Sequence, residues 1–82
     1  MRVQVRYFAG AAAAAGTPAE HVDIEAAATV SDVLALLQEH RPGLGPVLAV
    51  ASVLVDEVAV RDRSRRLSDG ALVDVLPPFA GG

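Results

Sequence analysis

The sequence predicts an α+β fold with one main helix packed on one face of a mixed β-sheet. Three observations predict it: a strand-like alternating segment opens the chain, one amphipathic helix pattern occupies its middle, and short apolar runs follow. Elements in this order form a sheet that the helix crosses on one face. A length of 82 residues is enough for one domain.

Residues 2–8 are predicted to form the first strand, because apolar and polar side chains alternate there with a period of two. The side chains expected to face inward are those of Val3, Val5 and Tyr7. Residues 21–25 alternate again, with Val22 and Ile24 inward, and predict a second strand antiparallel to the first. Between them, the alanine-rich residues 10–16 favour a short turn of helix.

The main helix is predicted to begin at Thr29. Thr29 and Asp32 form a near capping box, with aspartate in the usual place of glutamate or glutamine. The apolar residues that follow fall at i, i+3, i+4 and i+7 and form one stripe. These residues are Val30, Val33, Leu34 and Leu37. Arg41 is expected just past the helix end, because Pro42 and Gly43 stop the helix.

The remaining elements are short. Residues 43–46 are interpreted as a connection and residues 47–50 as a short helical turn. Asp56 and Glu57 are expected in the turn between two of the strands, although neither is the glycine that a tight type I′ hairpin prefers. The strands are expected at residues 52–55, 58–60 and 72–76. In such an order the first and last strands often pair in parallel at the sheet centre, which is the β-grasp.

Composition excludes several classes of function. A net charge of −3 gives no basic field that would favour nucleic acid. No run approaches the roughly 20 apolar residues of a membrane helix, and the N-terminus lacks a signal-peptide pattern. We therefore expect a cytoplasmic protein that binds neither nucleic acid nor membrane. The absence of cysteine and lysine excludes a thiolate nucleophile and Schiff-base chemistry.

Other charged residues give weaker indications. His21 and His40 lack the spacing of metal ligands, so both are expected on the surface and no metal site is expected. Four arginines fall in one loop, where they either are solvated or bind an acidic partner or a phosphate. They are Arg61, Arg63, Arg65 and Arg66.

The chain ends in Pro77-Pro78-Phe79-Ala80-Gly81-Gly82. The two prolines lack amide donors and end sheet pairing, and Phe79 is a large apolar group placed as a docking anchor would be. The last three residues have almost no side chain, so they can thread a narrow channel. The alternative is a frayed terminus that happens to end in glycine. We predict a domain of residues 1–76 and a flexible tail of residues 77–82.

Gly82 is the candidate reactive residue. Its carboxylate is inert until adenylation by ATP makes it an acyl-adenylate, which a sulfur nucleophile converts to a thiocarboxylate. Glycine at the reacting position leaves the carbonyl open to attack. Function is therefore expected at the tail.

Four segments carry a resemblance to a known family: Arg6-Tyr7-Phe8-Ala9, residues 29–34, Leu67-Ser68-Asp69-Gly70 and the tail. Together they resemble the MoaD/ThiS family of ubiquitin-like sulfur carriers. The double proline is more typical of MoaD, the small subunit of molybdopterin synthase, than of ThiS. The resemblance extends over nearly the whole chain.

The resemblance implies a ubiquitin-like β-grasp whose catalytic side chains come from partners, so that the chain is not catalytic alone and binds no cofactor. An activating adenylyltransferase, MoeB-like and using ATP and Mg, would act on Gly82. The thiocarboxylate would then enter a MoaE-like large subunit and donate sulfur to a pterin precursor in molybdenum cofactor biosynthesis. Ala80 and Gly81 would thread the partner's channel. The partner is expected to dock on the exposed sheet face through a largely apolar contact. The residues expected to make this contact are Pro77, Pro78, Phe79 and Phe8.

Two alternatives stay open. One is a carrier that supplies sulfur for thiamine or cysteine synthesis, and the other is a protein modifier joined through Gly82 to lysines of other proteins. Alanines occupy residues 11–15, where family members often carry an Arg-Glu pair.

Overall fold

The computed structural model describes residues 1–78. These residues form one five-stranded mixed sheet in the order β2-β1-β5-β3-β4. The elements are β1 (Arg2–Tyr7), α1 (Gly10–Ala15), β2 (Ala19–Asp23), α2 (Val30–His40), the 3-10 helix η1 (Pro42–Leu44), α3 (Gly45–Val50), β3 (Ser52–Val55), β4 (Val58–Val60) and β5 (Leu72–Leu76). β1 and β5 pair in parallel at the centre of the sheet, which confirms the predicted β-grasp.

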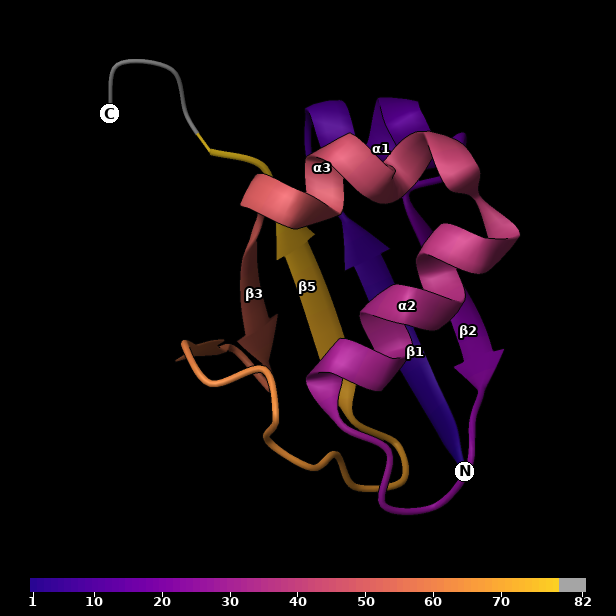
Figure 1. Cartoon of the computed structure of the whole chain (residues 1–82), viewed down its shortest axis with the longest axis vertical. Helices are drawn as coiled ribbons and strands as arrows, with labels where there is room; N and C mark the ends of the chain where they lie inside the picture. Colours follow the sequence, from indigo (N-terminus) through magenta and orange to yellow (C-terminus); the bar gives the residue numbers. More distant parts are fainter. Residues whose placement is uncertain (79–82) are drawn as a thin grey trace.

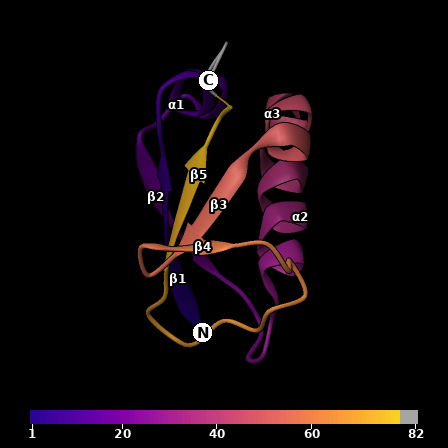
Figure 2. The same ribbon diagram turned by 90° about the vertical axis from the view of Figure 1, so that its left-hand side faces the viewer.

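The helices and the sheet form two layers. α2 and α3 cover one face of the sheet, and α1 lies beyond the end at which β1 stops (Figures 1 and 2). The opposite face, called here the outer face, carries no helix within residues 1–78. None of the helices in this part of the chain has the length and hydropathy to span a bilayer.

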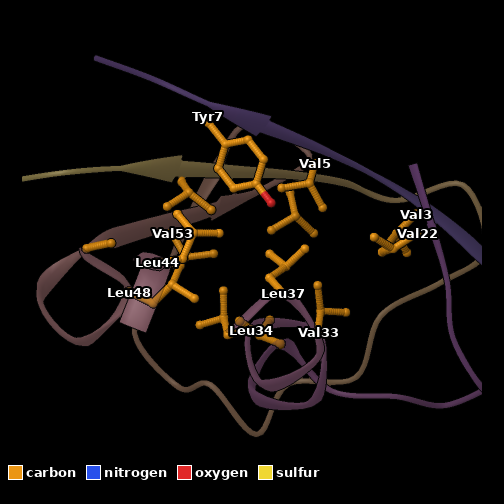
Figure 3. Packing of buried hydrophobic residues seen from close by; sticks show 14 of the residues in the cluster. Val3, Val5, Tyr7, Val22, Val33, Leu34, Leu37, Leu44, Leu48 and Val53 are labelled. Carbon is orange, nitrogen blue, oxygen red and sulfur yellow. The ribbon is translucent and has the colours of Figure 1, made fainter. Parts of the chain in front are cut away.

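The core lies between the sheet and α2. Val3, Val5 and Tyr7 of β1 are at most 3% exposed, which confirms the predicted inward face. The stripe of α2 meets them across the layer (Figure 3). The residues of this stripe are buried, as predicted: Val30, Val33, Leu34 and Leu37. The apolar side chains that alternate along β1 therefore pack against the apolar stripe of α2.

The start and end of α2 are as predicted. The Thr29 Oγ1 atom accepts a hydrogen bond from the Asp32 amide at 3.1 Å, and Asp32 Oδ2 accepts one from the Thr29 amide at 2.9 Å. This reciprocal capping box satisfies two amides that the helix leaves without partners. Arg41 is the C-terminal cap residue.

The segment after α2 is more helical than predicted. The expected connection at residues 43–46 is instead covered by η1 and the first turn of α3. Pro42 and Pro46 each stand in the first turn of a helix, where a missing amide donor has no consequence. The prolines therefore end α2 and start the next two helices.

The second strand lies two residues earlier than predicted, since it runs from Ala19 to Asp23 instead of over residues 21–25. Ile24 therefore lies just past the strand, partly buried against the core. The reason for the earlier start is Glu20, which lies opposite Val5 and on the inner side of the strand. A charged residue at an inward position interrupts the alternation of apolar and polar residues, so the sequence pattern does not show the start of the strand. Glu20 can face inward because Tyr7 and Arg41 donate hydrogen bonds to its carboxylate. β1 also ends one residue early, at Tyr7, because Ala9 turns the chain with a φ of 49°.

The β3–β4 hairpin turns without glycine. Asp56 and Glu57, predicted as turn residues, have φ values of 49° and 69°, the sign that a type I′ turn needs at both central residues. The turn is also tied to β5, because the Asp56 amide donates to the Leu72 carbonyl at 2.8 Å. Asp56 Oδ1 accepts from the Leu72 amide at 3.0 Å.

Candidate functional site

The tail leaves the sheet at the end where the two central strands stop. Because β1 and β5 run in parallel, Tyr7 at the end of β1 lies opposite Val75 near the end of β5. Pro77 is half-buried and Pro78 exposed. The predicted site residues Phe79, Ala80, Gly81 and Gly82 lie outside the described part of the chain. The structure therefore positions the base of the tail.

Apolar side chains gather on the outer face beside this exit. The register places Leu54 of β3 opposite Asp74 of β5, with Leu72 and Leu76 on either side of that aspartate. Phe8 continues the outward-facing positions of β1 next to Leu76, and it is 39% exposed. We call these four residues the outer patch: Phe8, Leu54, Leu72 and Leu76.

A buried carboxylate lies at the centre of the outer patch. Asp74 is 2% exposed, and Arg6 on the neighbouring strand covers it. The Arg6 Nε and Nη2 atoms donate to Asp74 Oδ1 and Oδ2 at 2.7 and 2.8 Å. Such a two-point contact combines the strength of charge-assisted hydrogen bonds with a fixed orientation of the guanidinium. The hydrogen bond to Asp74 raises the pKa of Arg6 above its usual range.

Phe8 is held against this ion pair. The Arg6 Cζ atom lies 5.6 Å from the centroid of the Phe8 ring, within the range of a cation–π contact. The Phe8 amide donates to the Val75 carbonyl at 3.1 Å. Ala9 then turns with φ 49° and ψ −126°, a conformation that suits glycine. The backbone of Phe8 is therefore held by this hydrogen bond and by the turn at Ala9, and its ring lies beside the Arg6 guanidinium.

The other half of the outer face is polar. Over β1 and β2 the outward positions include Gln4 and His21, which lie opposite each other. Arg2 and Asp23 form an ion pair at 3.1 Å in which both side chains are mostly exposed. The prediction of an apolar contact on the exposed sheet face therefore applies to the β5–β3 half only.

Of the four arginines in the loop of residues 61–66, called here the arginine loop, one hydrogen-bonds to the backbone of the domain and three are exposed. The Arg63 guanidinium donates to the carbonyls of Leu48 and Ala51 at 3.2 and 2.9 Å, which caps the end of α3. The solvated interpretation is thus wrong for Arg63. Arg61, Arg65 and Arg66 are exposed and form no ion pair with any residue of the described chain. The loop lies at the end of the sheet opposite the tail exit (Figure 1).

His21 and His40 are both exposed, as predicted. No group of three or more potential metal ligands occurs within residues 1–78. Sequence reasoning missed the Arg6–Asp74 pair. Its signal was present, because Asp74 interrupts the otherwise apolar run of residues 72–76 and Arg6 is an outward residue of the first strand.

A five-stranded mixed sheet with two parallel strands at its centre and one long helix across it is the fold of ubiquitin-like proteins. The model of the ThiS family matches residues 5–82. The chain belongs to this family and is a ubiquitin-like sulfur carrier. No curated protein sequence matches it.

Solved structures agree with this assignment. The solution structure of a Haloferax volcanii protein is 32% identical, with a TM-score of 0.88 over 100% of this chain and 87% of that one. The small archaeal modifier protein 1 from the same organism is 27% identical, with a TM-score of 0.89 over the whole of both chains. The complex of subunits 1 and 2 of the molybdopterin-converting factor from Helicobacter pylori contains a chain 26% identical, with a TM-score of 0.76 over the whole of both chains.

Proposed function

We propose that this carrier is the small subunit of a molybdopterin synthase and that the Gly82 carboxylate carries the sulfur. The observation that supports this most directly is the place of the tail, which starts at the edge of the outer patch. A protein that packs on Phe8 and Leu76 would therefore also receive the tail.

The chemistry divides between the chain and its partners. An activating enzyme joins the Gly82 carboxylate to the AMP portion of ATP and releases pyrophosphate, and Mg offsets the charge of the phosphates. A sulfur nucleophile then displaces AMP and leaves a thiocarboxylate. In the large subunit the thiocarboxylate sulfur would form a bond to a carbon of the pterin precursor, and water would cleave the resulting thioester and restore the Gly82 carboxylate. A second thiocarboxylated chain would supply the second sulfur of the dithiolene. Residues 1–78 contribute docking and the position of the tail.

Two features favour the molybdopterin branch. The tail carries the double proline typical of MoaD, and a chain that occurs in a two-subunit complex, the molybdopterin-converting factor, is similar to this one over its whole length. The fold alone does not separate the branches, because small archaeal modifier protein 1 shares it as well. The partner would be a MoaE-like large subunit, with a MoeB-like enzyme for activation. The outer patch suits such a contact, since apolar side chains surround an ion pair that is already neutral.

A protein-modifier role is the second candidate. It is favoured by the similarity to small archaeal modifier protein 1. Carriers for thiamine or cysteine synthesis remain alternatives within the same chemistry.

Reconstitution with defined partners tests the proposal. Thiocarboxylated protein is mixed with a MoaE-like subunit and its pterin precursor, or with a thiazole synthase and its precursor. Dithiolene formation with the first is expected. Sulfur transfer only to the thiazole precursor, or isopeptide adducts on other proteins without dithiolene, would reject the molybdopterin assignment.

Deletion of Gly82 tests whether this residue carries the sulfur. It moves the carboxylate back by about 3.3 Å, far beyond what a positioned reaction tolerates. We expect an unchanged thermal melt and loss of thiocarboxylate by mass spectrometry. A deleted protein that still accepts and donates sulfur would overturn the role of Gly82.

A further inference from the structure

Arg6 has hydrogen-bonding capacity that the domain does not use. A guanidinium carries five N–H groups, and Asp74 takes one from Nε and one from Nη2. Within residues 1–78, Asp74 is the only acceptor of a hydrogen bond from this side chain. The Arg6 side chain is 40% exposed, whereas that of Asp74 is 3% exposed. The unused N–H groups therefore face solvent from the middle of the outer patch.

A protein that covers the outer patch removes the water from these N–H groups. Donors of a charged group that lose water without gaining an acceptor weaken binding substantially. Arg6 cannot turn away, because Asp74 holds it at two points and the Phe8 ring lies against it. The partner surface must therefore bring an oxygen to Arg6.

The charge balance indicates which oxygen. Arg6 and Asp74 together are neutral, and Asp74 is buried. A carboxylate from the partner would place a second negative charge beside one cation in an apolar contact, which is unfavourable. A carbonyl oxygen satisfies the donors without adding charge.

We propose that Arg6 is a specificity-determining residue of the carrier, which accepts partners that place a backbone or amide carbonyl oxygen opposite its free guanidinium edge, inside an apolar surface that covers the outer patch. Asp74 is the positioning residue that fixes this edge. The proposal deepens the proposed function and rests on it, because it concerns the same docking face.

The test replaces both charges together. Arg6→Leu alone leaves Asp74 buried without a partner, so loss of binding in that variant has two explanations. The double variant Arg6→Leu/Asp74→Leu removes the whole pair and makes the patch more apolar, and neutral or raised stability is expected of it. If Arg6 binds a carbonyl, the double variant binds a MoaE-like subunit about tenfold or more weakly, because the partner oxygen is left unpaired.

Three readouts decide the outcome. Equal or tighter binding by the double variant, with an unchanged melt, would show that Arg6 only covers Asp74 and would overturn the proposal. The loss is expected to be the same at low and high salt, and a loss that shrinks with salt would mean a carboxylate acceptor and overturn the carbonyl assignment. Self-association of the wild type that the double variant abolishes would assign the patch to a second copy of this chain and overturn it as well.

A matched control separates this proposal from the proposed function. Leu54→Ser removes an apolar side chain of the outer patch while both charged residues, Arg6 and Asp74, are kept, and weaker binding is expected. If wild-type protein binds the large subunit and Leu54→Ser weakens it, the docking face is correct and the double variant alone decides the role of Arg6. Wild-type protein that binds neither the large subunit nor the activating enzyme would overturn both.

Discussion

The phenol of Tyr7 donates a hydrogen bond of 2.6 Å to Glu20 Oε2, and the same carboxylate oxygen accepts one from Arg41 Nε at 2.9 Å. Arg41 also donates to the Ala15 carbonyl at 2.6 Å. This group of polar contacts joins β1, β2, the end of α1 and the cap of α2 at one side of the core. It explains why a glutamate can occupy an inward position.

Removing the phenol oxygen is expected to weaken this joint. Tyr7→Phe keeps the ring in the core but leaves Glu20 with Arg41 alone, and we expect the free energy of unfolding to fall by about 1 kcal/mol. Urea unfolding at neutral pH measures it. No loss of stability would mean that Arg41 and solvent satisfy Glu20 without Tyr7.

Alkaline pH should act through the same residue. Burial, followed by the hydrogen bond to Glu20, raises the pKa of Tyr7 above its ordinary value of 10. A raised folded-state pKa means stability that is fully present below the unfolded value and is lost as pH rises toward the folded one. We expect the wild type to lose stability above about pH 10, and Tyr7→Phe to show less loss. Parallel slopes would contradict this.

Acid should act through Glu20. Burial alone would raise the pKa of Glu20, but the hydrogen bonds from Arg41 and Tyr7 outweigh it and hold the pKa below the ordinary 4.5. Such a group contributes stability above the unfolded pKa and loses it as pH falls through the folded value. Glu20→Gln should therefore be less stable than the wild type at pH 7 and converge with it below about pH 4. Thermal melts between pH 3 and 7 follow the convergence.

Glycine at residue 9 is expected to stabilise the domain. Ala9 has φ 49° and ψ −126°, and such a conformation costs an alanine about 1–2 kcal/mol. Ala9→Gly should raise the free energy of unfolding by about 1 kcal/mol after the entropy of glycine is counted. Ala13→Gly, at an exposed helical residue, is the control and should lower it by about 0.5–1 kcal/mol. Equal losses in both variants would argue against the strain.

Arg63 and Arg65 should differ, although both belong to the arginine loop. Arg63→Ala removes the donors to Leu48 and Ala51 at the end of α3 and should lower the free energy of unfolding by about 1–2 kcal/mol. Arg65→Ala should stay within about 0.5 kcal/mol of the wild type, because its side chain is exposed. Chemical denaturation of both variants provides the comparison.

Phe8 should matter for binding more than for stability. Phe8→Ala removes an exposed ring of the outer patch, so partner affinity should fall by about 1–3 kcal/mol while the melt moves little. The same result is expected of Phe79→Ala if Phe79 is an anchor. Val58→Ala is the control, since Val58 is 59% exposed but lies outside the patch. An equal loss of affinity in the control would show that the outer patch is not the surface that binds the partner.

The sequence predicts this fold well where the signal is local. The capping box at Thr29 and Asp32 lies within four residues, and the strands at 52–55, 58–60 and 72–76 each show their own apolar pattern. Two of the failures, at Glu20 and at Asp74, share one cause. Glu20 faces inward because Tyr7 and Arg41 reach it, and Asp74 is buried because Arg6 reaches it. Such hydrogen bonds join residues far apart in the chain, so the local sequence around either residue does not predict them.

The parallel pairing of β1 with β5 also has a consequence for synthesis of the protein. β5 is the last strand of the sheet to be made, so the centre of the sheet cannot form until all the other strands have been synthesised. Pairing of such distant segments slows folding. The outer patch draws on β1, β3 and β5 together. A chain that lacks β5 therefore cannot display the complete patch, and the proposed partners would bind the folded domain but not such a fragment.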